Sequence, residues 1–125
     1  MHNSTAIEDI KKCSVQYILA VNDTLNVLSG KWKLSIIGSL HFGKKRFKDL
    51  QHDISAITPR MLSKELKELE LNSIIKRTVY DTTPVKVEYE LTESGHSLND
   101  VLEAMLEWGV AHRKNVIHKT ESTLS

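Results

Sequence analysis

Three cationic side chains recur at helical spacing in the middle of the chain. Arg60, Lys64 and Lys67 stand at positions i, i+4 and i+7, so a helix places them on one face. The leucines of the same segment fall on a different face, which is the pattern of a helix with one buried side. Cations so arranged, with Ser63 beside them, can bind phosphates and base edges in a nucleic-acid groove. The alternative is an ordinary solvated helix in which lysines alternate with glutamates.

Several start signals precede these cations. Thr58 can cap a helix with its hydroxyl, and Pro59 takes the first helical position, where a missing N–H costs nothing. Ile57 and Leu62 stand at the two positions of a hydrophobic staple. We therefore predict a helix that begins after Thr58 and ends at an Asn72-Ser73 turn, where asparagine tolerates the left-handed conformation.

Three more helices are predicted before this one. Apolar residues at helical spacing indicate a first helix that ends at Ser29-Gly30, a second over residues 32–40, and a short third over residues 47–54. The third and fourth helices are close enough in sequence, and apolar enough where they face each other, to form a helix-turn-helix.

After the fourth helix the apolar period changes from 3.6 to 2. Alternating runs at 75–80 and 85–91, joined by a turn that contains Pro84, predict a β-hairpin. The side chains predicted to face water are Lys86, Glu88 and Glu90. Thr92 can then cap a long last helix. The expected fold class is mainly α with a small β-hairpin (α+β), in the element order of a winged helix-turn-helix with extra helices at both ends.

Length and composition fit a single domain. The chain has 125 residues and 14.2 kDa, of which 40% are hydrophobic and 26% charged. It has no apolar run of membrane-spanning length and no visible signal peptide, so we expect a cytoplasmic protein. We expect a loose tail over residues 1–12, the winged helix-turn-helix with its flanking helices over 13–112, and a polar tail over 113–125.

Charge is unevenly distributed although the net charge is only +1. Residues 44–77 contain nine basic and five acidic side chains, a net charge of +4. Residues 81–107 contain one basic and seven acidic side chains, a net charge of −6. This asymmetry indicates that one face of the protein attracts an anion and another does not.

Signatures of catalysis and metal binding are missing from the sequence. It has no glycine-rich phosphate loop, no HExxH and no Ser/His/Asp order at motif spacing, so we expect no enzyme. The single cysteine excludes an internal disulfide, and the six histidines form no metal-ligand pattern, so we expect neither a metal nor a cofactor. The alternative function is a winged helix used for protein–protein contact.

Both terminal helices carry more apolar surface than a domain of this size can cover alone. We predict that these helices pack across a two-fold axis to form a homodimer; the alternative is that they fold back on their own core. The predicted interface residues are Val15, Ile18, Leu19, Leu98, Val101, Leu102, Met105 and Leu106.

Four segments of the chain carry a resemblance to a known family. They are SGKWK at 29–33, KRFKDL at 45–50, ITPRMLSKELKELE at 57–70 and VEYELTESG at 87–95. In this order and spacing, and with the Trp108-Gly109 pair, the chain resembles the HxlR-type bacterial transcription regulators. The resemblance covers roughly residues 25 to 109. It implies a homodimer that binds an inverted-repeat DNA operator, with the fourth helix in the major groove and the hairpin against the backbone or minor groove.

The resemblance also implies roles for individual residues. The leading end of the recognition helix is formed by Thr58, Pro59, Arg60 and Met61. Arg60 and Lys64 contact base edges or phosphates, whereas Ser63 and Lys67 follow the groove. Arg46 holds a phosphate, and Lys86 is the expected contact from the hairpin.

In several members of this family a cysteine near the N-terminus senses oxidants or electrophiles. Cys13 stands in a Cys-Ser-Val start similar to the family's Cys-Pro-Val, without the proline. The neighbouring Lys11 and Lys12 can lower the pKa of a thiol, which makes it more reactive. We expect Cys13 to be a redox sensor or to have no role, and an oxidant or small molecule to be the effector if there is one.

Overall fold

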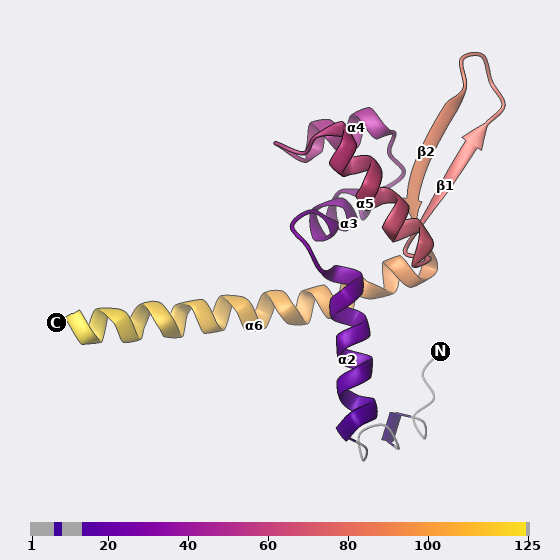
Figure 1. Cartoon of the computed structure of the whole chain (residues 1–125). Helices are drawn as coiled ribbons and strands as arrows, with labels where there is room; N and C mark the ends of the chain where they lie inside the picture. Colours follow the sequence, from indigo (N-terminus) through magenta and orange to yellow (C-terminus); the bar gives the residue numbers. More distant parts are fainter. Residues whose placement is uncertain (1–6, 9–13, 125) are drawn as a thin grey trace.

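The computed structural model describes residues 7–8 and 14–124, with side chains described as far as Ile117. Its elements follow the order that the sequence predicts, helices first and then a hairpin and a long helix (Figure 1). They are α2 (Ser14–Leu28), α3 (Lys33–Leu40), α4 (Phe47–Asp53), α5 (Pro59–Leu71), β1 (Ile75–Tyr80), β2 (Lys86–Leu91) and α6 (Glu93–Leu124). The expected fold class, mainly α with a small hairpin in a winged helix-turn-helix, is confirmed.

The hydrophobic core lies where α3, α4 and α5 meet the base of the hairpin (Figure 1). Each of these elements contributes at least one side chain that is almost completely removed from water. The largest such side chains are Ile36, Leu40, Leu50, Leu62, Leu69 and Ile75. Trp32 and Tyr89 pack against this cluster from its edge. The core therefore fixes α5 on its leucine side and leaves the opposite side outward.

The helix-turn-helix begins each of its helices with a capping interaction. At α4 the Asp49 carboxylate accepts a hydrogen bond from the Arg46 backbone N–H at 3.0 Å. At α5 the Thr58 hydroxyl accepts one from the Met61 N–H at 3.2 Å, with Pro59 in the first turn. The predicted start of α5 is confirmed.

The end of α5 lies at the predicted Asn72-Ser73 turn, and the left-handed residue of this turn is Ser73. Asn72 keeps a negative φ of −86°, and Ser73 takes the left-handed conformation with φ 60°. The reason is that Asn72 donates both its backbone N–H and its side-chain amide to the carbonyl of Glu68, which holds it in line with the helix. The reversal of chain direction therefore falls on the next residue.

The two strands pair antiparallel, from Ile75 opposite Leu91 to Tyr80 opposite Lys86. Lys45, which precedes α4, forms an isolated antiparallel bridge with Tyr89 of β2. Its N–H donates to the Tyr89 carbonyl at 2.9 Å, and its carbonyl accepts from the Tyr89 N–H at 2.8 Å. A single bridging residue has no period that a sequence can reveal. This bridge ties the start of the helix-turn-helix to the wing.

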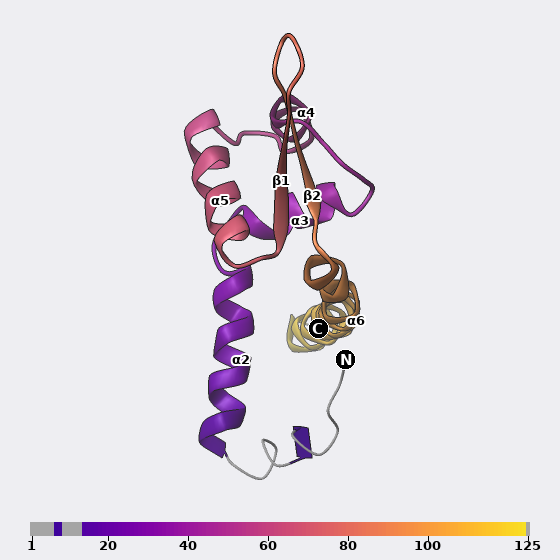
Figure 2. The same cartoon turned by 90° about the vertical axis from the view of Figure 1, so that its right-hand side faces the viewer.

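The prediction that one face of β2 is exposed to water is wrong. Glu88 and Glu90 are half-buried like their neighbours, whereas Val79 and Val85 are 52% and 65% exposed. The tip of the hairpin extends beyond the helices, so the side chains at the tip are covered on neither face (Figure 2). Lys86 is also half-buried, and alternation along the strand therefore does not separate core from solvent there.

The first and last helices extend away from this body. α2 points away from the hairpin tip, and α6 carries the C-terminus far to one side (Figures 1 and 2). α2 ends at Leu28, ahead of Gly30 with its φ of 93°, as predicted. α6 continues to Leu124, through the segment predicted as a polar tail. Of the tail predicted over residues 1–12, only Ile7 and Glu8 are described. None of the helices described here is long and apolar enough to cross a membrane.

The junction of β2 and α6 gives a stability prediction. Thr92 caps α6 by accepting the Gly95 N–H at 3.0 Å, and its hydroxyl lies 2.6 Å from the Ser73 carbonyl. A Cβ at Gly95 would lie 2.3 Å from the backbone oxygen of Ile74. We expect Gly95→Ala to lower the free energy of unfolding by about 1–3 kcal/mol, because backbone must move. Urea denaturation measures this loss.

The matched control is the same substitution further along α6. A Cβ at Gly109 meets nothing within 4 Å. Gly109→Ala should therefore leave stability unchanged or raise it by up to about 1 kcal/mol, because alanine favours helix over glycine. Equal effects of the two substitutions would contradict the packing described at Gly95.

Candidate nucleic-acid interface

The exposed face of α5 is cationic. Arg60, Lys64 and Lys67 are all exposed, whereas the leucines on the other side of the helix are buried in the core. Within the described part of the chain, none of these three cations forms an ion pair. Their charges are therefore available to an anion in solution.

The leading end of α5 is open to solvent as well. Thr58, Pro59, Met61 and Ser63 are exposed. The Thr58 hydroxyl caps the Met61 N–H, so its oxygen is already engaged within the protein. The positive end of the helix dipole lies at the same place, and it favours an approaching phosphate.

Arg46 adds a cation at the start of α4. Its side chain is exposed, and it forms no ion pair among the described residues. Lys45 next to it is engaged within the protein, because its ammonium pairs with the Asp53 carboxylate, which also accepts from the Ser39 hydroxyl at 2.7 Å. The hydrogen bond from Lys45 makes the largest contribution to lowering the pKa of Asp53 below its ordinary value, and the hydrogen bond from Ser39 lowers it further.

The glutamates of α5 pair with a residue that the sequence analysis did not single out. Lys33 of α3 is only 6% exposed, and its ammonium lies 2.7 Å from Glu65 Oε2 and 2.5 Å from Glu68 Oε2. Burial lowers the pKa of Lys33, but the hydrogen bonds and charges of both glutamates outweigh it, so the pKa is raised overall. Its ammonium in turn lowers the pKa of Glu68. The glutamates of α5 are thus paired with a lysine of another helix.

A groove of about 370 Å³ separates α5 from the hairpin, lined by Ser63, Leu66, Lys67, Glu70, Arg77 and Tyr89. Arg77 on β1 thereby places a further exposed cation on the same side as Lys67. Arg77 was not among the site residues predicted from the sequence. The sequence signal that could have identified Arg77 is its position on the apolar face of the alternating strand, between Ile75 and Val79.

Lys86, the residue expected to act from the hairpin, contacts its own strands. Its ammonium lies 3.6 Å from Glu88 Oε1 and 5.2 Å from the centre of the Tyr80 ring. These contacts fold the side chain along the hairpin. The positive charge of Lys86 is thus partly neutralised, whereas Arg60, Lys64 and Lys67 form no ion pair in the described part of the chain.

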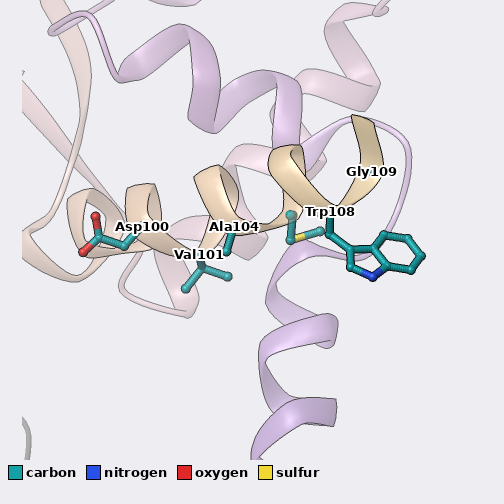
Figure 3. A pocket seen from close by; sticks show the side chains of 6 residues that line it. Asp100, Val101, Ala104, Trp108 and Gly109 are labelled. Atoms are coloured by element: carbon teal, nitrogen blue, oxygen red, sulfur yellow. The ribbon is translucent and has the colours of Figure 1, made fainter. Parts of the chain in front are cut away.

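An apolar surface follows the two projecting helices. In α2, Val15, Ile18 and Leu19 are exposed, and in α6 the exposed residues include Val101, Met105 and Leu106. A hollow along α6 is lined by Asp100, Val101, Ala104, Met105, Trp108 and Gly109, and the Trp108 indole extends outward from the helix (Figure 3).

Two residues predicted for the dimer interface pack against the core of their own chain. Leu98 and Leu102 are half-buried and pack against the central cluster. They lie in the part of α6 that follows β2 directly, where the helix still contacts the body of the protein. At Leu98 and Leu102, α6 packs on the core of its own chain, as the alternative to a dimer described above.

Two further expectations concern a thiol and a metal. Cys13 lies outside the described residues. In the described part of the chain, no group of three or more histidine, cysteine, aspartate or glutamate side chains is arranged to hold a metal ion.

Comparison with known proteins assigns the chain to a family. The family model for the HxlR-like helix-turn-helix matches residues 27–116. The HTH-type transcriptional regulator YtcD of Bacillus subtilis, itself uncharacterised, is 43% identical over 109 residues, which cover 87% of this chain and 86% of YtcD.

Solved structures agree with this assignment. The redox regulator HypR in its reduced form superposes with a TM-score of 0.71 at 42% identity, over 78% of this chain and 96% of HypR. The reduced form of the transcriptional regulator YodB from Bacillus subtilis superposes with a TM-score of 0.67 at 42% identity, over 70% of this chain and 85% of YodB. The chain therefore belongs to the HxlR-like helix-turn-helix family of winged-helix transcription regulators.

Proposed function

We propose that this protein binds double-stranded DNA in a sequence-specific manner, with α5 in the major groove. The observation that carries the proposal is the face of α5 made by Arg60, Lys64 and Lys67, which is exposed and cationic and forms no ion pair with any side chain that the structure describes. Arg60 at the leading end reads base edges, and Lys64 and Lys67 bind phosphates along the groove. Ser63 lies between Arg60 and Lys64 in the sequence, and its hydroxyl can donate a hydrogen bond to a base edge or to a phosphate.

The neighbouring elements provide contacts that set the orientation of α5. Arg46 at the start of α4 binds a backbone phosphate, because its side chain is exposed and unpaired within the described residues. The hairpin lies beside α5 and contributes Lys86 to the backbone or minor groove. Its contribution is smaller, since the Lys86 ammonium already contacts Glu88.

The protein acts as a homodimer in this proposal. The exposed apolar residues of α2 and α6 pack against those of a second copy, so that both sets are removed from water. Two recognition helices related by a two-fold axis would meet major grooves roughly 34–36 Å apart, so the operator is an inverted repeat.

The test begins with selection of bound duplexes from a random-sequence library, using the full chain. We expect an inverted repeat, bound by a species of twice the 14.2 kDa chain mass in light scattering. Fluorescence anisotropy should then show log K falling linearly with log salt, with a slope of about −0.9 for each phosphate contacted. The proposal is excluded if the selection enriches no sequence and the affinity for a random duplex does not depend on salt. These results would favour a module for protein–protein contact.

A redox response through Cys13 is a second proposal, favoured by the similarity to the redox regulator HypR. Because the chain has one cysteine, a disulfide formed by diamide must join two copies. Two thiols lose two electrons and two protons, and diamide is reduced to the hydrazine. We expect diamide to change the affinity for the selected operator in the wild type and not in Cys13→Ser. An equal change in both would exclude Cys13 as the sensor.

A further inference from the structure

A buried lysine lies behind the recognition helix. Lys33 belongs to α3, and the pairing of its ammonium with Glu65 and Glu68 joins α3 to α5 across 32 and 35 residues of sequence. Both carboxylates belong to α5, on the flank between its leucine side and its cationic face. The side chain of Glu65 is only 13% exposed, whereas that of Glu68 is 40% exposed. Glu68 is therefore the carboxylate closer to solvent and to anything bound by α5.

The charge balance of α5 depends on this contact. Outside its leucine side the helix carries the three cations Arg60, Lys64 and Lys67, together with Glu65, Glu68 and the more distal Glu70. Without Lys33 the two glutamates would face their neighbours as uncompensated charges, and the Glu68 carboxylate already interacts with Lys64. An unpaired carboxylate within reach of a DNA backbone repels it.

We propose that Lys33 is a positioning residue for DNA binding, which holds the Glu65 and Glu68 carboxylates against α3 so that these two carboxylates do not repel the duplex beside the cations of α5. This inference rests on the proposed function. The lysine contacts no DNA itself, because its ammonium is buried between two helices. The arrangement explains how a helix rich in glutamate offers a cationic surface.

Three variants test this role by anisotropy with the selected operator. Lys33→Met keeps the chain length and apolar stem but frees both carboxylates, and we expect affinity to fall roughly tenfold. The triple variant Lys33→Met/Glu65→Gln/Glu68→Gln also lacks the ion pairs but carries no free carboxylate there, and it should recover most of the affinity. The conservative Lys33→Arg should bind nearly as tightly as the wild type. Raised salt should narrow the gap between Lys33→Met and the triple variant, because free charges are screened.

A purely structural role predicts a different pattern. If Lys33 only joined α3 to α5, the triple variant would bind as weakly as Lys33→Met, and this result would overturn the proposal. If Lys33→Met fails to fold by circular dichroism, Lys33→Met/Glu65→Gln replaces it, since that variant differs from the triple only at Glu68. Equal affinity of this pair would likewise overturn the proposal, and weaker binding by the variant that keeps Glu68 would support it.

The outcome separates this inference from the proposed function. Should the wild-type protein not bind duplex DNA at all, the proposed function fails first. Should the wild type bind, and Arg60→Ala weaken it, while Lys33→Met binds as the wild type does, only the role of Lys33 is wrong.

Discussion

Arg60→Ala is expected to lower the affinity for the selected operator by roughly 5- to 150-fold, which corresponds to about 1–3 kcal/mol. Arg60 stands in the first turn of α5, exposed and free of ion pairs among the described residues, so its guanidinium is the cation best placed to meet a base edge. The loss should be largest for the operator and smaller for a scrambled duplex, because a base contact distinguishes sequences and a phosphate contact does not. Anisotropy titrations with both duplexes measure the difference.

Lys67 and Lys114 provide the comparison for this experiment. Lys67→Ala should weaken binding to the operator and the scrambled duplex alike and reduce the salt slope by about one unit, as expected for a phosphate contact. Lys114, an exposed cation far along α6, should be replaceable by alanine without effect. If the Arg60→Ala and Lys114→Ala variants bind the operator equally well, α5 is not the helix that contacts the bases.

The second large effect concerns the other side of the same helix. Leu69 is 0% exposed and packs in the central cluster, so Leu69→Ala should lower the free energy of unfolding by about 2–5 kcal/mol. A domain of this size has a total stability of about 5–15 kcal/mol, so the loss is a substantial part of it. Urea denaturation followed by circular dichroism gives the value.

Leu71 is the matched control in the same helix, since it is 85% exposed. Leu71→Ala should change the free energy of unfolding by no more than about 0.5 kcal/mol. A similar loss in both variants would show that the helix is not oriented with Leu69 inward, and the cationic face would then not point outward either.

Much of this arrangement could be predicted because it depends on local sequence. The start of α5 is determined by the cap at Thr58 and the proline at position 59, and its two faces by the spacing of leucines and cations. The hairpin was visible as a change of period. These signals lie within a few residues of each other, so they can be recognised without knowledge of the tertiary contacts.

The features that were missed depend on contacts between distant segments. Nothing near Lys33 in the sequence identifies its partners, which lie 32 and 35 residues away. The one local signal is that Lys33 shares a helical stripe with Ile36, Ile37 and Leu40, where a cation needs a buried partner. The burial of β2 was mispredicted because alternation separates the faces of a strand only where one of them is covered, as at Leu91 and not at Val85.

Protection of individual lysines from acetylation, measured by mass spectrometry with and without the selected operator, tests most directly whether the cationic face of α5 binds DNA. With the operator bound, Lys64 and Lys67 should react several-fold more slowly, and Lys114 should react as before. Unchanged reactivity of Lys64 and Lys67 in a saturated complex would contradict the placement of α5 in the groove.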